Sequence, residues 1–212
     1  MTIVLPRLDR STAADRGITL ADFLVPIRVG ENTPTRVRHI ALIMAGALIV
    51  TLCARIVIPA TPVPFTGQTF GVLAVGAALG FRRGALALLL YLAIGALGFG
   101  VFAQGDSGVS QILGRTGGYL VGFVVAAAVV GRLAELGWDR HIGGAIAAMA
   151  IGTALIYAIG VPWLKLVAGI PWETAVSAGM TKFLVWDAAK LLVAAGIFPV
   201  AWWLIGRRPE DR

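Results

Sequence analysis

Two ionisable residues of opposite charge stand three positions apart inside an apolar stretch near the C-terminal end of the chain, T-K-F-L-V-W-D-A-A-K-L-L-V-A-A-G over residues 181–196. At this spacing Asp187 and Lys190 project from one face of a helix and can form an ion pair. A charged residue at membrane depth costs roughly 2.5–3.5 kcal/mol by insertion scales, so it usually faces a cavity or a partner. We interpret the pair as part of a ligand site, with helix packing by a self-neutralising pair as the alternative.

The composition is typical of an integral membrane protein. Of the 212 residues, 58% are hydrophobic and 14% are charged, and the mean hydropathy is +0.86. Soluble domains are about 45–50% apolar and about 25% charged. The net charge of +7 comes from arginines at the ends of apolar runs rather than from a basic, aromatic stripe, so we expect no nucleic-acid partner. A lone cysteine (Cys53) and two histidines at span edges (His39 and His141) predict no metal site.

Hydropathy predicts an all-α membrane protein with six transmembrane helices in a compact bundle. The predicted spans cover about residues 39–58, 68–81, 85–103, 119–136, 143–162 and 181–205. Residues 1–38 are expected to form an N-terminal tail that contains a short interfacial helix over residues 18–29, broken at Pro26. Residues 206–212 are expected to form a C-terminal tail. No apolar run occurs early enough for a secretory signal, so the N-terminal tail is predicted to be retained.

The distribution of basic residues predicts the orientation of these spans. Thirteen basic residues fall in the two tails and in the segments around residues 82–83 and 132–140. The opposite set of span ends carries only four, namely Arg55, Arg115, Lys165 and Lys182. The positive-inside rule therefore places both termini in the cytoplasm.

Three unusual segments then face outward, above the charged pair. They are the proline-rich stretch 61–69, the glycine-rich loop 104–118 and the tryptophan-bearing segment 161–180. Together they outline an outward-opening pocket with a few polar groups in apolar surroundings, as ligand sites have. The guanidinium of Arg115, in the second segment, could bind a carboxylate through two parallel hydrogen bonds. An ordinary loop-to-helix junction explains the presence of this arginine equally well. No strand precedes these glycines and no G-K-[ST] follows, which excludes a nucleotide-binding loop.

Enzyme and channel functions are disfavoured by what the spans contain. Neither histidine lies at membrane depth, so an intramembrane serine protease would have no base. Apart from Glu135 at the exit of the fourth span, Asp187 is the only acidic residue within a predicted span, which excludes a two-carboxylate site at membrane depth. A channel would need rings of polar residues along a path, and too few are present.

Four motifs in order carry a resemblance to a known family. They are P-V-P-F-T-G-Q-T (62–69), L-G-R-T-G-G-Y-L-V-G-F (113–123), Y-A-I-G-V-P-W-L (157–164) and D-A-A-K (187–190). With these motifs on a six-span profile, the chain from about residue 41 to residue 205 resembles the BioY family, the biotin-specific S components of energy-coupling-factor (ECF) transporters.

The resemblance implies a function, a set of partners and a set of site residues. It implies a membrane subunit, not an enzyme and without a cofactor, that captures biotin from outside the prokaryotic plasma membrane. Its partners would be membrane lipid, a transmembrane coupling subunit and two ATPase subunits. The binding residues carried over from the family are Arg115, Asp187 and Lys190, with weaker support for Gln68, Gln104, Tyr119 and Tyr157. Ala41 and Ala45, four apart, match the small-residue pattern that S components use against the coupling subunit.

Biotin matches this residue set chemically, and several alternatives stay open. Asp187 could accept from the ureido N–H groups, while Arg115 and Lys190 could serve the carboxylate or the ureido carbonyl in either order. The aromatic residues expected either to wall the ligand ring or to pack in the core are Phe102, Trp163 and Trp186. The other functions left open are a solitary biotin carrier, an S component for another vitamin and a scaffolding membrane protein.

Overall fold

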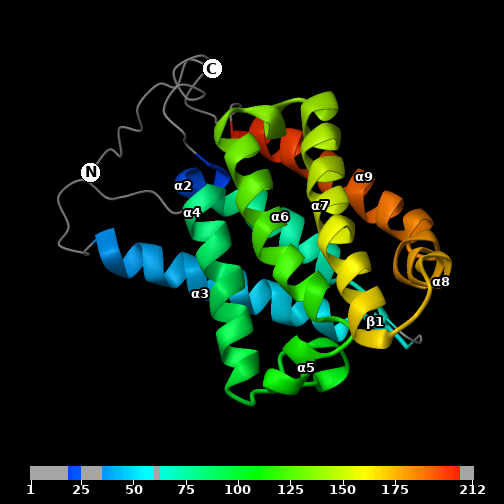
Figure 1. The fold of residues 1–212 in the computed structure, drawn as a ribbon. Helices are drawn as coiled ribbons and strands as arrows, with labels where there is room; N and C mark the ends of the chain where they lie inside the picture. The colour runs from blue at the N-terminus through cyan, green and yellow to red at the C-terminus, as the bar shows by residue number, and fades with distance from the viewer. Residues whose placement is uncertain (1–18, 25–34, 60–62, 206–212) are drawn as a thin grey trace, which may run out of the picture.

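The structure is a computed structural model that describes residues 19–24, 35–59 and 63–205. Its helices are α2 (Leu20–Leu24), α3 (Thr35–Arg55), α4 (Gln68–Ala96), α5 (Val109–Leu113), α6 (Gly117–Glu135), α7 (Ile142–Ala168), α8 (Trp172–Val176) and α9 (Leu184–Ile205) (Figure 1). Short helical turns are η1 (Ala103–Gly105), η2 (Trp138–Arg140) and η3 (Ser177–Thr181). The strands β1 (Val57–Ile58) and β2 (Phe65–Thr66) pair antiparallel.

The predicted class, an all-α membrane protein, agrees with the structure, but the predicted count of six spans is not confirmed. Five helical segments of the described ranges are long and apolar enough to cross a membrane: 36–55, 68–96, 117–135, 142–168 and 172–204. The difference arises because the span expected over 68–81 and most of the span expected over 85–103 fall in one element, α4, whose helical backbone is interrupted at Gly80. The reversal expected at residues 82–84 occurs slightly earlier, at Gly80, and residues 82–84 are already helical.

α4 is sharply bent, and its two arms run antiparallel. Gly80, at φ 83° and ψ −179°, interrupts the helical backbone in a conformation that side chains other than glycine rarely adopt. The Nε2 of Gln68 donates to the hydroxyl of Tyr91 at 2.7 Å, although 23 residues separate them. A straight helix would place these residues about 35 Å apart. The chain therefore reverses near Gly80 and returns beside its own first arm.

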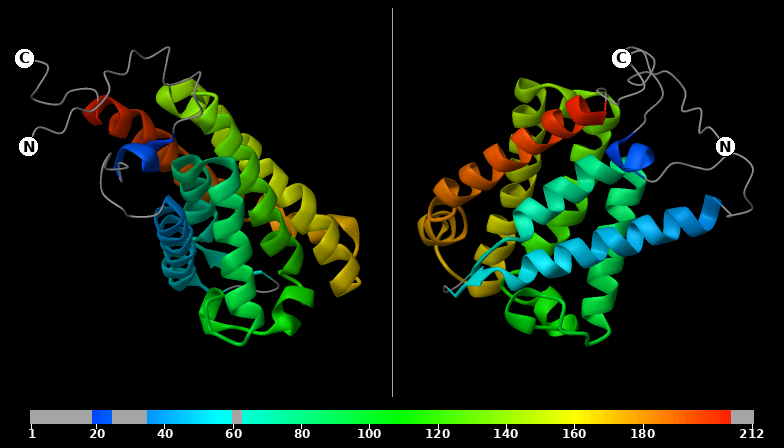
Figure 2. Two further views of the ribbon diagram at one scale, coloured as in Figure 1. Left: turned by 90° about the vertical axis from the view of Figure 1, so that its left-hand side faces the viewer. Right: turned by 180° about the vertical axis from the view of Figure 1, so that it is seen from behind.

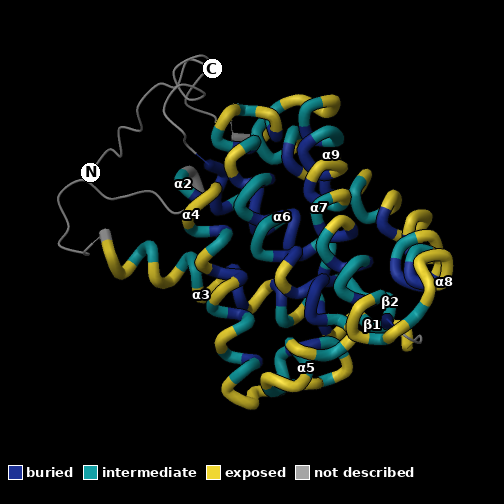
Figure 3. The backbone as a smooth tube through the Cα atoms, viewed as in Figure 1, coloured by how far each residue is buried: buried dark blue, intermediate teal, exposed yellow. Residues whose placement is uncertain are grey.

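α6 lies at the centre of the bundle and packs against both α4 and α7. The buried residues concentrate on the facing sides of these three helices (Figure 3). A Cβ atom on Gly76 of α4 would lie 2.7 Å from the carbonyl oxygen of Ala127, so glycine is required for this close approach. α3 instead runs along the outside of the bundle, and its N-terminal half extends away from it (Figures 1 and 2).

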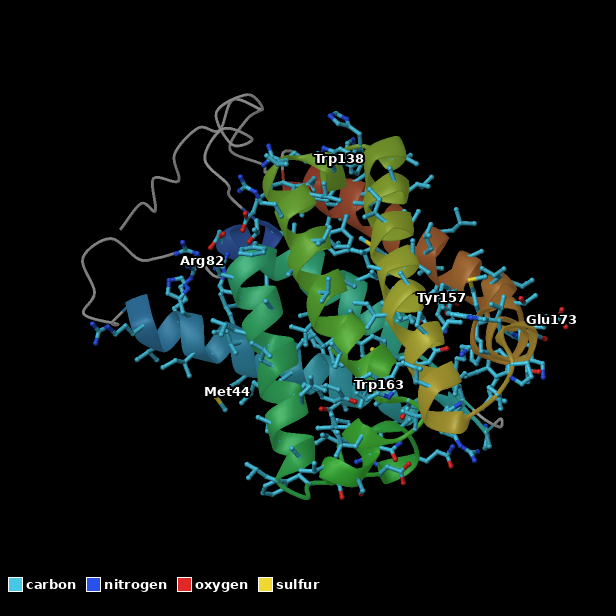
Figure 4. The ribbon with its side chains drawn as sticks, viewed as in Figure 1. Met44, Arg82, Trp138, Tyr157, Trp163 and Glu173 are labelled. Atoms are coloured by element: carbon cyan, nitrogen blue, oxygen red, sulfur yellow. The ribbon has the colours of Figure 1, made fainter. Side chains whose placement is uncertain are left out.

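The basic loop ends and the segments predicted to outline the pocket lie at opposite ends of the bundle. Figure 4 shows Arg82 and Trp138 toward one end and Trp163 toward the other. α5 and the β1–β2 pair also lie at the end that carries Trp163 (Figure 1). This separation agrees with the division of basic residues in the sequence, while the orientation across the membrane stays a prediction.

At the basic end, the short helix α2 packs against α4 and α9. Asp22 accepts from Nη1 and Nη2 of Arg83, both at 2.7 Å, and from Nη2 of Arg38 at 2.9 Å. Thr19 is buried and donates its hydroxyl to Asp22 at 2.9 Å. Asp22 therefore links α2 to the start of α3 and to the second arm of α4.

The environment of Asp22 favours its charged form. Burial by itself would raise the pKa of this carboxyl, but hydrogen bonds from Arg83 and Arg38 more than offset that effect and hold the pKa well below its usual range. A carboxyl with a lowered pKa in the folded state stabilises the fold above its unfolded pKa, and this stabilisation is lost as the pH falls.

We predict that Asp22→Asn lowers the free energy of unfolding by about 2 kcal/mol at neutral pH, because it removes charge-assisted hydrogen bonds to two arginines. Thermal unfolding in detergent between pH 7 and pH 3 measures the effect. The difference in unfolding temperature between the variant and the wild type should narrow below about pH 4, where the carboxyl of the unfolded chain takes up its proton. Asp106→Asn, at an exposed position on the opposite end, is the matched control. A gap that stays constant across this range would contradict the ion-pair account.

Candidate functional site

A cavity opens at the end of the bundle that lies away from the basic residues. Its empty volume is about 630 Å³, including the part open to solvent. The residues that line it come from the β2 region, η1, α5, α4, α6, α7, η3 and α9: Val63, Pro64, Thr66, Gln68, Thr69, Phe102, Ala103, Gln111, Thr116, Tyr119, Leu120, Phe123, Ile156, Tyr157, Gly179, Phe183, Asp187 and Lys190.

The predicted ion pair is present on α9 and faces this cavity. Nζ of Lys190 lies 2.8 Å from Oδ1 of Asp187, and Asp187 is only 5% exposed. Thr69, from the first arm of α4, donates its hydroxyl to the same oxygen at 3.1 Å. Tyr157, labelled on α7 in Figure 4, donates its hydroxyl to Oδ2. A buried carboxylate is thus held by one cation and two hydroxyl groups, which compensate its loss of hydration.

Lys190 also joins α9 to the β1–β2 pair. Its Nζ donates to the backbone carbonyl of Thr66 at 2.6 Å and to the hydroxyl of Thr69 at 3.2 Å. The pairing of Val57 with Thr66 in the two strands fixes the position of that carbonyl. The lysine therefore has a structural partner on the wall of the cavity in addition to Asp187.

Gln68 is held between the β2 strand and the second arm of α4. It is buried, accepts from the hydroxyl of Thr66 at 3.0 Å and donates to Tyr91 at 2.7 Å. The Tyr91 ring in turn meets the edge of Phe102, with centroids 5.4 Å apart. The bend in α4 thus brings Tyr91 into contact with Gln68 and Phe102, and both of these side chains line the cavity.

The remaining walls are mainly apolar. Phe102, Phe123 and Phe183 are buried and line the cavity. Tyr119, on α6, donates its hydroxyl to the Gly179 carbonyl at 2.8 Å and so connects α6 to the η3 turn. Apolar walls with a few convergent polar groups can enclose a ring system and orient its polar edge.

The structure brings together five of the seven predicted binding residues in this cavity, namely Gln68, Tyr119, Tyr157, Asp187 and Lys190. Arg115 and Gln104 are exposed and do not line it. Each is one position from a lining residue, because Thr116 follows Arg115 and Ala103 precedes Gln104. Their roles in binding stay predictions.

Of the three aromatic residues considered as walls for a ligand ring, the structure places only Phe102 in the lining. Trp163 donates its Nε1 to the Gly114 carbonyl at 2.9 Å, which ties α7 to the glycine-rich loop. Trp186 is 56% exposed. It faces away from the core, as expected of a side chain in contact with lipid.

Sequence reasoning missed the threonines of the site. Thr66 and Thr69 contact the ion pair, and Thr116 lines the cavity beside Gln111. A usable signal was present for the first two, since both flank Gln68 in the proline-rich motif. Thr116 carried a weaker signal, as the neighbour of Arg115.

Comparison with known proteins decides the family. A sequence model described as the BioY family matches residues 28–207. The chain belongs to the BioY family. Biotin transporter BioY of Thermotoga maritima is 39% identical over 156 residues, which are 73% of this chain and 90% of that protein. Biotin transporter BioY2 of Lactococcus lactis subsp. cremoris is 34% identical over 170 residues, 79% of this chain and 91% of that protein.

A solved structure shares the fold of this BioY-family chain. It is the crystal structure of the S-component for biotin from an ECF-type ABC transporter, with a TM-score of 0.73 at 22% identity. The match covers 82% of this chain and 95% of the other. The resemblance drawn from the four motifs is therefore confirmed. Together with the long apolar helices, it identifies a multi-pass membrane protein.

Proposed function

We propose that this chain is the biotin-binding, substrate-capture subunit of an ECF-type vitamin uptake transporter in a prokaryotic plasma membrane. The names of its relatives and the shared S-component fold support a role in biotin uptake. The observation that carries the proposal is the ion pair of buried Asp187 and half-buried Lys190 on the wall of a mainly apolar cavity. A membrane protein seldom keeps such a pair at a cavity without a polar ligand for it.

Biotin offers groups that match the two ends of the cavity. Its ureido ring donates two N–H groups, for which the Asp187 carboxylate is the acceptor. Its thiophane ring fits against the buried phenylalanines. Its carboxylate, on a flexible chain, would reach Arg115, which is exposed and precedes the lining residue Thr116. A guanidinium binds a carboxylate through two parallel hydrogen bonds.

The proposed function also assigns an orientation and a number of crossings. The two arms of α4 each run along the bundle, so the chain would cross the membrane six times through five helices. The basic end would face the cytoplasm and the cavity the outside, as the positive-inside rule requires. Biotin would then enter from outside without passing the cytoplasmic end.

The coupling subunit would bind the outer face of α3. Ala41 and Ala45 are exposed, on the same helix face as the exposed side chains of Met44 and Leu48. Two small residues four apart on an apolar face allow another helix to approach closely. The two ATPase subunits would supply energy through that coupling subunit.

We predict that purified protein in detergent binds biotin tightly and that Asp187→Asn raises Kd by roughly tenfold or more, because a charged acceptor of the ureido N–H groups is lost. Isothermal titration measures both values. Asp106→Asn, an exposed acid outside the cavity, is the matched control and should leave Kd unchanged. Folded wild-type protein that gives no heat with biotin would contradict the assignment and favour another vitamin or a packing role.

We predict that the double variant Ala41→Leu/Ala45→Leu keeps the wild-type Kd for biotin but no longer co-purifies with a coupling subunit and loses most biotin uptake in cells. Leucine fits a lipid-facing surface, yet it prevents close approach of a second helix. Val185→Leu, at a 79% exposed position on α9, is the control for an added methylene in lipid.

Uptake by the double variant at the wild-type rate would contradict the proposed interface. Full uptake by the wild type in cells without coupling and ATPase subunits would instead favour a solitary carrier.

A further inference from the structure

The hydroxyl of Thr69 lies between the two charged groups of the site. It accepts from Nζ of Lys190 at 3.2 Å and donates to Oδ1 of Asp187 at 3.1 Å. Thr69 is the second residue of α4 and lines the cavity. It therefore occupies one hydrogen-bonding position on each member of the ion pair.

Lys190 has no N–H group left for a ligand in this arrangement. A lysine ammonium carries three N–H donors. The three acceptors around it are the Thr66 carbonyl, the Thr69 hydroxyl and Oδ1 of Asp187, at 2.6, 3.2 and 2.8 Å. A ligand could gain a bond from this cation only by displacing one of them.

Asp187, in contrast, keeps open acceptor positions. A carboxylate has about four lone-pair positions. Oδ1 receives Lys190 and Thr69, whereas Oδ2 receives only Tyr157 among the described residues. The hydroxyl proton of Tyr157 is used in that bond. The open capacity of this cluster therefore lies on acceptor atoms.

We propose that Thr69 is a specificity-determining positioning residue. Its hydroxyl binds both Nζ of Lys190 and Oδ1 of Asp187, so the cluster of Thr69, Asp187 and Lys190 offers a ligand only hydrogen-bond acceptors. It therefore selects a ligand whose head group donates N–H. The inference rests on the proposed function, and a cyclic urea such as that of biotin is the matching class of head group. Loss of the hydroxyl would free one N–H of Lys190 and one position on Oδ1. The pair would then offer both donors and acceptors, and its preference for N–H donors would weaken.

The test compares two ligands of the same shape in wild-type protein and in Thr69→Val. One ligand is biotin, and the other is its cyclic carbonate analogue, in which ring oxygens replace both ureido N–H groups. The wild type should bind biotin at least about 100-fold more tightly, because the analogue leaves a buried acceptor unpaired. In Thr69→Val, which keeps the shape of the side chain, the ratio of the two Kd values should fall by roughly tenfold. Thr69→Ser, which keeps the hydroxyl, should restore it.

The ratio of the two Kd values distinguishes a role in ligand selection from a merely structural role, since a distorted cavity would weaken the binding of both ligands by the same factor. Thr153→Val is the control, because the Thr153 hydroxyl donates to the Met149 carbonyl within α7 and lies outside the cavity lining. It should leave both Kd values unchanged. If Thr69→Val does not fold, Thr69→Ala is titrated in its place and the same fall in the ratio is expected.

Two results would overturn the inference, and they differ. A wild type that binds biotin selectively, with an unchanged ratio in the Thr69 variants that lack the hydroxyl, would contradict the inference alone. A folded wild type that binds neither ligand would contradict the proposed function, and the inference would fall with it.

Discussion

A carboxylate buried at membrane depth must be hydrogen-bonded and charge-compensated, and this constraint shapes the whole site. Asp187 meets it through partners on three helices: Lys190 on α9, Thr69 on α4 and Tyr157 on α7. Lys190 extends the network to the Thr66 carbonyl on β2. The mutual arrangement of these elements is therefore fixed by one polar cluster, whose groups converge on a preformed cavity.

The bend in α4 makes this convergence possible. Its first arm begins with Gln68 and Thr69 at the cavity, and Gly80 turns the chain so that the second arm returns Tyr91 to the same level. At the opposite end, Asp22 of α2 holds Arg83, which stands just after the bend. α2 lies before residues 28–207, the part that matches the family. Asp22 thus ties a segment outside the matched residues to the bend of α4.

Much of the fold and of the site could be predicted from the sequence, because the patterns that indicate them are local. The spacing of Asp187 and Lys190 predicted their ion pair, and apolar runs predicted the membrane class. The exact position at which the chain reverses in α4 could not be predicted in the same way, because a reversal at the arginines and one at Gly80 give the same hydropathy profile. The role of Thr69 depends on a contact across more than a hundred residues, and no local pattern reports such a contact.

The measurement that tests the central claim most directly is an experimental structure of the protein with biotin bound. The account predicts the ureido ring beside Asp187, with an N–H within about 3.2 Å of Oδ2. It also predicts that Lys190 still contacts Thr69 and the Thr66 carbonyl. Biotin bound outside this cavity, or bound there with its carboxylate against Lys190 in place of Thr66 and Thr69, would contradict the account.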